Sequence, residues 1–132
     1  MRYLLDTNVL IALTKGLGRV ADRLEKLDAS SVLLPTVVVA EIEYGIAKSR
    51  KRATNRRVFD ELLAGFDIAV FNAAAASAYG PIRASLERKG TLIGPNDLLI
   101  AATAVALKAT LVTDNLREFQ RVDGLRVENW LA

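Results

Sequence analysis

Short apolar runs alternate along the chain with longer stretches in which apolar residues recur at helical spacing. The runs of strand length are residues 2–5, 31–34, 67–71, 110–112 and 125–130. The stretches with helical spacing are residues 9–13, 19–27, 37 to about 51, a segment ending at 65, 73–89, and 97 to about 108. Strands that alternate with helices predict an α/β domain with a mainly parallel sheet.

Side chains able to cap a helix stand near the expected helix starts, where the backbone N–H groups of a first turn need acceptors. Gly90 follows the alanine-rich helix and is expected to end it. The predicted caps are Thr7 or Asn8, Thr36, Thr54 or Asn55, and Asn72.

The composition excludes several kinds of chemistry. With 132 residues, 52% of them hydrophobic, the chain is long and apolar enough for one folded domain over residues 1–132. It has no cysteine and no histidine, which excludes thiolate and imidazole zinc sites, Ser-His-Asp and Cys-His catalysis, and an imidazole base. Any catalysis must therefore use carboxylates, amines, hydroxyls or a bound cation.

The sequence shows no signal peptide and no apolar run of membrane-spanning length. The lack of cysteine agrees with a cytoplasmic location, so we expect a soluble cytoplasmic protein. A net charge of +3 permits a polyanionic partner without requiring one.

Four acidic residues stand at or near the ends of apolar elements: Asp6 and Asp114 after strands, and Glu41 and Asp97 on helices. Individually they have ordinary explanations, such as a turn, a surface carboxylate, or an acid favoured by the helix dipole. In one pocket, however, their negative charges repel and raise their pKa values unless a hard cation binds among them. Oxygen ligands of this kind indicate Mg²⁺ or Mn²⁺.

The helix after the second strand carries two acids. At about 100° per residue, Glu41 and Glu43 point to different sides, so they cannot belong to one site. Gly45, one turn beyond Glu41, leaves room there for a ligand or a neighbouring backbone.

A basic segment covers residues 48–57 and has the sequence KSRKRATNRR, with six cations in ten residues. A solvated helix end is the ordinary explanation of such a run. The functional alternative is contact with an RNA backbone, to which Arg83 and Arg88 are possible contributors. The candidate RNA-binding residues within it are Lys48, Arg50, Lys51 and Arg52.

Four segments carry a resemblance to a known family. They read LLDTNVLIAL, VVVAEIEYGI, IGPNDLLIAATAVAL and LVTDNLREFQRVDGLRVENW, and they occur in this order over essentially the whole chain. Each is weak alone, but their order and spacing are specific. The sequence resembles the PIN-domain ribonucleases, and among them the VapC-type toxins of toxin-antitoxin pairs.

The resemblance implies roles for individual residues. Asp6, Glu41 and Asp97 match the family's acidic metal ligands, and Asp114 matches a fourth position that is often Asn in relatives. Asn8 and Thr113 match hydrogen-bonding supports. Thr103 is a departure, because many relatives carry histidine there.

The fold that the resemblance implies is a three-layer α/β/α domain, and the activity is hydrolysis of RNA phosphodiesters with Mg²⁺ or Mn²⁺. A cognate small antitoxin and a homodimer are the partners it implies. Two alternatives are an RNA-binding or regulatory module without catalysis, and a metal-dependent phosphatase. The phosphatase requires a second Asp two residues after Asp6, where this chain has Asn8, and the retention of all four acids argues against a module without catalysis.

Overall fold

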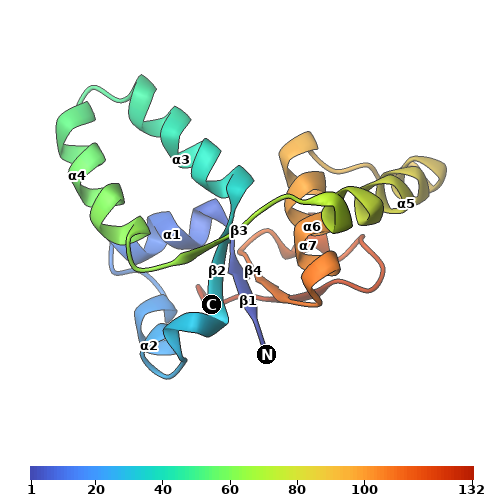
Figure 1. Ribbon diagram of the computed structural model, residues 1–132, viewed down its shortest axis with the longest axis horizontal. Coiled ribbons are helices and arrows are strands. Elements are labelled where there is room, and N and C mark those ends of the chain that lie inside the picture. The colour runs from blue at the N-terminus through green and yellow to red at the C-terminus, as the bar shows by residue number, and fades with distance from the viewer.

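Five short parallel strands form one sheet in the order β3-β2-β1-β4-β5 in the computed structural model, which describes residues 1–132 (Figure 1). The two strands next to each other at the centre, β1 and β4, contribute side chains with no exposed surface, including Leu4, Leu5 and Leu111. This confirms the predicted parallel sheet. The strands are β1 Tyr3–Leu5, β2 Val32–Pro35, β3 Asp67–Ala69, β4 Thr110–Val112 and β5 Arg126–Glu128.

Helices cover both faces of the sheet, with α1 to α4 on one side and α5 to α7 on the other (Figure 1). The three-layer α/β/α arrangement is therefore confirmed. No helix is long and apolar enough to cross a membrane. The helices are α1 Thr7–Thr14, α2 Val20–Glu25, the 3-10 turn η1 Ala29–Ser31, α3 Thr36–Lys48, α4 Arg52–Leu63, α5 Ala73–Lys89, α6 Pro95–Leu107 and α7 Leu116–Phe119.

The predicted helix starts are partly wrong. Asp6, not Thr7 or Asn8, is the residue whose side chain accepts a first-turn N–H of α1. Thr36 is the first residue of α3, and its hydroxyl donates to the Ala69 carbonyl at 3.3 Å instead of capping. Asn72 does cap α5 as predicted, accepting from the backbone N–H three residues on at 3.0 Å.

The connection between α3 and α4 is also shifted from the prediction. The helix expected to reach residue 51 ends at Lys48, because Ser49 adopts an extended backbone with ψ of 148°. Thr54 and Asn55 then lie inside the first turn of α4 and cap nothing. No side chain caps α4; the Ser49 hydroxyl instead accepts from Lys51 N at 3.0 Å and from Asn55 Nδ2 at 2.7 Å, which ties the connection to the first turn.

The C-terminal segment packs back against the loop between α1 and α2. Trp130 is buried, its ring lies 5.4 Å from that of Tyr3, and its carbonyl accepts from Arg19 N at 2.7 Å. Gly18, with φ of +65°, lies directly against this segment. The close approach of two backbones therefore requires a residue without a Cβ at position 18.

Replacing Gly18 by alanine should destabilise the protein by more than the same change at Gly16. Both glycines have positive φ, and an alanine there costs about 1–2 kcal/mol. A Cβ at Gly18 would in addition lie 2.7 Å from Leu131 Cα, whereas one at Gly16 would meet nothing within 4 Å. We expect Gly18→Ala to lose roughly 1–3 kcal/mol beyond Gly16→Ala in urea unfolding. Equal losses in the two variants would contradict this packing argument.

Candidate active site

The site begins at the carboxyl ends of the two central strands. Leu5 pairs with Val112 in the parallel register, so Asp6 and Thr113, the next residues, leave the sheet side by side. The carboxyl ends of parallel strands are where α/β sheets bind ligands. The acid after β1 is thus delivered to a site by the sheet itself.

Asp6 is buried, with only 5% of its surface exposed. Three protein groups donate hydrogen bonds to its carboxylate. Its Oδ2 accepts from the Thr113 hydroxyl at 2.8 Å and from Asn8 Nδ2 at 3.1 Å, while Oδ1 accepts from Thr7 N at 2.8 Å. Burial raises the pKa of Asp6, with a smaller contribution from the charge of Glu41, and these three donors oppose the rise. The cap role and the predicted site role coexist in this one residue.

Asn8 and Thr113 are placed as the supports that the sequence suggested. Asn8 also accepts through Oδ1 from Asp114 N at 3.2 Å, and the Thr113 hydroxyl accepts from Asn115 N at 3.0 Å. These two side chains tie the start of α1 to the loop after β4. The orientation of the Asp6 carboxylate therefore depends on both.

Glu41 and Glu43 lie apart, as the helical spacing predicted. Glu41 Oε1 accepts from the Thr7 hydroxyl at 2.7 Å, which connects α3 to the residue that follows Asp6. Glu43 instead receives two hydrogen bonds from Arg56 of α4, at 2.7 and 2.8 Å. Only Glu41 belongs to the group of acids around Asp6.

Asp97, in the first turn of α6, forms a hydrogen bond with Glu118 of α7. Burial, the hydrogen bond with Glu118 and the charges of Asp6, Glu118 and Glu41 raise the pKa of Asp97 to about 7. The same hydrogen bond lowers the pKa of Glu118, which also accepts from Asn115 Nδ2 at 2.9 Å. The carboxylates from β1, α3, α6 and α7 thus lie close enough to affect one another's protonation.

Glu118 is a site residue that the sequence reasoning missed. The fourth acid named from the sequence, Asp114, has an exposed side chain, and the contact that ties it to the site is made by its backbone N–H. The signal for Glu118 was Asn115 three residues before it, a spacing typical of a helix start. In the structure these two side chains bind each other instead of the backbone.

Thr103 has the surroundings of a buried residue that supports the fold. It is buried in α6, and its hydroxyl donates to the Leu99 carbonyl at 2.8 Å, one turn back. Nothing in the structure connects it to the acids.

Comparison with known proteins agrees with this geometry. The PIN-domain family matches residues 3–125. The chain is 42% identical to Ribonuclease VapC2 of Rickettsia felis and 35% identical to the tRNA(fMet)-specific endonuclease VapC of Shigella flexneri, with 98% of each chain covered in both cases. Its fold matches VapBC2 of Rickettsia felis bound to a promoter DNA fragment, with a TM-score of 0.92 at 40% identity over 98% of this chain and 99% of the other. The chain belongs to the VapC ribonucleases of the PIN-domain family.

The chain is therefore a VapC-type endoribonuclease, the toxin of a toxin-antitoxin pair. This confirms the expected fold, family and enzyme class. VapC nucleases are generally metal-dependent, and the donor set here is made only of oxygen atoms, as Mg²⁺ and Mn²⁺ prefer.

The acids of this VapC site are held by protein donors rather than gathered around one point. No group of three or more is close enough to form a metal cage as the side chains stand. Asp6 and Glu41 are bound by hydroxyl and amide donors, and Asp97 is turned to Glu118. Their mutual repulsion is nevertheless the condition that a bound cation relieves, so the donor chemistry fits such an ion.

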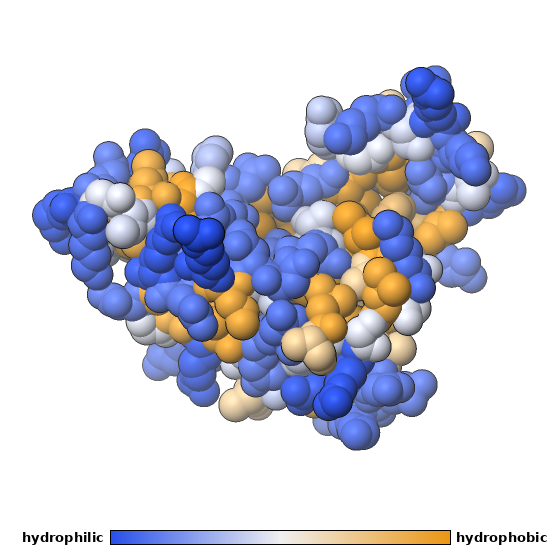
Figure 2. Space-filling view, turned by 180° about the vertical axis from the view of Figure 1, so that it is seen from behind, coloured by the Kyte–Doolittle hydropathy of each residue, from blue (hydrophilic) through white to orange (hydrophobic).

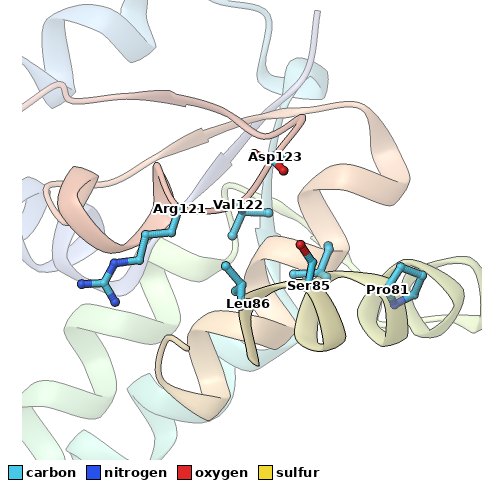
Figure 3. A pocket seen from close by; sticks show the side chains of 7 residues that line it. Pro81, Ser85, Leu86, Arg121, Val122 and Asp123 are labelled. Atoms are coloured by element: carbon cyan, nitrogen blue, oxygen red, sulfur yellow. The ribbon is translucent and has the colours of Figure 1, made fainter. Parts of the chain in front are cut away.

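A groove of about 280 Å³ adjoins the acids of this VapC domain between α1, α3 and α4. Glu41 and Thr7 lie along it, together with apolar side chains such as Ile46 and Phe59. A second pocket, of about 210 Å³, lies between α5 and the loop after α7. Figure 3 shows Leu86 and Ser85 of α5 facing Val122 across it. None of the acids of the candidate site lines this pocket.

The basic segment (residues 48–57) lies at the tip of the hairpin that α3 and α4 form. This tip is strongly hydrophilic in Figure 2. Arg56 is not free to bind RNA, because Glu43 and Asp60 hold its guanidinium. The Lys48 ammonium lies 4.8 Å from the centre of the Tyr44 ring. The side chains of Arg50, Lys51 and Arg52 are exposed.

Neutralising Asp97 should stabilise the metal-free protein above pH 7. Its folded pKa of about 7 lies above the ordinary value of 3.8, so only the folded chain keeps the proton between these values. Stability is therefore lost as the pH rises from about 4 to about 7. In EDTA, Asp97→Asn should melt above wild type at pH 8, and the difference should vanish toward pH 4. Asp114→Asn, which removes an exposed acid, is the control and should not change the Tm. A difference that does not depend on pH would refute the assignment.

Proposed function

We propose that this VapC-type enzyme hydrolyses RNA phosphodiester bonds with Mg²⁺ or Mn²⁺ held by Asp6, Glu41 and Asp97. The observation that carries the proposal is the approach of carboxylates from separate elements at the sheet edge, where burial, a hydrogen bond with Glu118 and the charges of Asp6, Glu118 and Glu41 together raise the pKa of Asp97 to about 7. The chain has no histidine or cysteine to activate water there, whereas a divalent cation bound by carboxylates can lower the pKa of an attacking water.

The three acids have different roles in the proposed site. Asp6 is immobilised by three donors and supplies a fixed oxygen, while Thr7 positions Glu41 from the opposite helix. Asp97 must release its proton before it can act as a ligand, because ligands bind metals in their deprotonated form. A bound divalent cation supplies charge stabilisation of the phosphate and a lower pKa for the attacking water.

The fourth acid has two candidates. Asp114 is suggested by the sequence resemblance, and Glu118 by its hydrogen bond to Asp97. Glu118 lies on a short helix that Asn115 ties to the loop after β4, which orients its carboxylate toward Asp97. The proposal includes Asp114 as a ligand and adds Glu118 as the carboxylate that accepts a hydrogen bond from protonated Asp97.

The substrate is RNA, and the basic segment provides its electrostatic contact through Lys48, Arg50, Lys51 and Arg52. The relative in Shigella flexneri is a tRNA(fMet)-specific endonuclease, which makes a tRNA the first substrate to test. Because the substrate is intracellular RNA, the proposal places the enzyme in the cytoplasm.

The partners we propose are an antitoxin and a second copy of the chain. The Rickettsia felis structure is that of VapBC2, and the groove beside Glu41 offers apolar walls to an inserted segment of such an antitoxin. An Arg or Lys from that segment would be attracted to the acids, and a disordered tail that folds on binding can cover a large surface. The second copy would form a homodimer with this chain, and homodimers usually close with two-fold symmetry.

RNA cleavage should require both the metal and Asp97. Purified protein with total RNA and with initiator tRNA in Mg²⁺ should produce mapped new 5′ ends, and EDTA should prevent them. Asp97→Asn should lose about 10²-fold or more in rate while remaining folded, since one charged ligand is removed at constant shape. Undiminished cleavage in EDTA or in this variant would exclude the proposed site.

The same assay separates the two candidates for the fourth acid. Glu118→Gln and Asp114→Asn are matched, because each replaces one carboxylate by its amide. We expect a loss of rate in both, and a larger one in Glu118→Gln. Full activity in either variant removes that residue from the site.

Removing charge from the basic segment should weaken the salt dependence of RNA binding. For single strands, log affinity falls against log salt with a slope of roughly 0.7 per neutralised phosphate. Replacing Arg50, Lys51 and Arg52 together by Ser in the inactive Asp97→Asn protein should reduce that slope by about 2. Lys26→Ser, at the C-terminal end of α2, is the control with no expected change. An unchanged slope in the triple variant would identify the segment as a solvated surface only.

Co-expression with a small reading frame encoded beside this one should yield a complex without ribonuclease activity. The complex should release active enzyme when the antitoxin is removed, because inhibition covers the site without unfolding the domain. Light scattering of the free enzyme should give the mass of a dimer at micromolar concentration. A neighbour that neither binds nor inhibits, or a monomeric mass, would remove the corresponding partner from the proposal.

A further inference from the structure

Tyr44 is exposed near the acids for no structural reason. It is the only aromatic residue among the exposed large hydrophobic side chains, with 66% of its surface exposed. It lies on α3 three residues after Glu41, and residues at this spacing are neighbours on a helix surface. The ring therefore stands next to the position at which Glu41 enters the site.

The surroundings of the ring are cationic and open. Lys48, one turn further along α3, places its ammonium 4.8 Å from the ring centre and starts the basic segment. Gly45, next in the chain, has no side chain, and a Cβ built there would meet no atom within 4 Å. Tyr44 thus has a cation beside its ring, and most of its surface is open to solvent.

An exposed aromatic ring between a basic segment and a group of acids matches the way single-stranded RNA is bound. Proteins bind such strands by combining cations along the backbone with aromatic rings on which bases stack. The other strongly exposed apolar residues, Met1 at 75%, Val70 at 63% and Leu17 at 54%, are not aromatic. Tyr44 alone joins the chemistry of stacking to the neighbourhood of the site.

We propose that Tyr44 stacks against a base adjoining the scissile phosphate, while Lys48 contacts the phosphate next to that base. The inference rests on the proposed ribonuclease site and specifies how its substrate is positioned. Tyr44 is a positioning residue, because its ring holds the strand in register and does not reach the reacting atoms.

The test measures binding of a single-stranded oligoribonucleotide to protein in which Asp97→Asn prevents cleavage. Tyr44→Phe keeps the ring and should bind as tightly as the parent. Tyr44→Leu keeps an apolar side chain without the ring and should bind about 5- to 100-fold more weakly, the range of one lost stacking contact. Val70→Ala, an exposed apolar residue on another element, is the control and should not change binding.

Two further measurements distinguish stacking from other roles. An abasic oligonucleotide keeps the phosphates and should bind the parent and Tyr44→Leu equally. Tyr44→Trp should bind RNA with quenching of its added fluorescence, because an exposed indole would become covered by a base. In active protein, Tyr44→Leu should raise KM more than it lowers kcat.

The outcomes separate this inference from the proposed function. If wild type cleaves RNA and Tyr44→Leu binds as tightly as the parent, stacking is excluded and the ribonuclease site stands. An equal loss on abasic RNA, or a change of mass in light scattering, would assign the ring to electrostatic support or to an interface between copies. If wild type neither binds nor cleaves RNA, both proposals fail.

Discussion

The repulsion between carboxylates at one edge of the sheet is the constraint on which the rest of this structure depends. A buried acid such as Asp6 is unfavourable unless hydrogen bonds compensate it, and a second acid nearby increases the cost. The fold meets this constraint with donors from three places: the first turn of α1, the end of β4 and the side chain of Asn8. The excess negative charge remains visible in the raised pKa of Asp97.

This arrangement places stability and function in opposition. In the absence of a cation, the protein is stabilised by keeping a proton between Asp97 and Glu118, whereas a metal ligand must be free of that proton. The supports are neutral hydroxyl and amide groups, so they orient the carboxylates without neutralising them. Neutralisation is left to the cation that the activity requires.

The α3–α4 hairpin gives α3 two functions on different faces. Its acidic inner side carries Glu41, held by Thr7, and its outer side carries Glu43, which binds Arg56 of the partner helix. Because Arg56 is held in this clamp, the hairpin is kept together by one cation of the basic segment while Arg50, Lys51 and Arg52 remain exposed. Within one short segment, one cation is thus bound in the fold while three others stay exposed for the substrate contact that we propose.

The sequence by itself determined the order of strands and helices and the parallel sheet, because hydrophobic periodicity is a local property. It also singled out Asp6, Glu41 and Asp97 as candidate acids, through their places in the predicted elements and the family resemblance. Helix ends were less predictable: Asp6 took the cap assigned to its neighbours, and no side chain caps α4, since several polar residues near a helix start can bind the same N–H groups or one another. Only the tertiary structure decided that Glu118 rather than the Asp114 side chain meets Asp97, and that Arg56 is bound to Glu43. These pairings join residues of different elements, and their geometry depends on how helices pack on the sheet, which no local pattern contains.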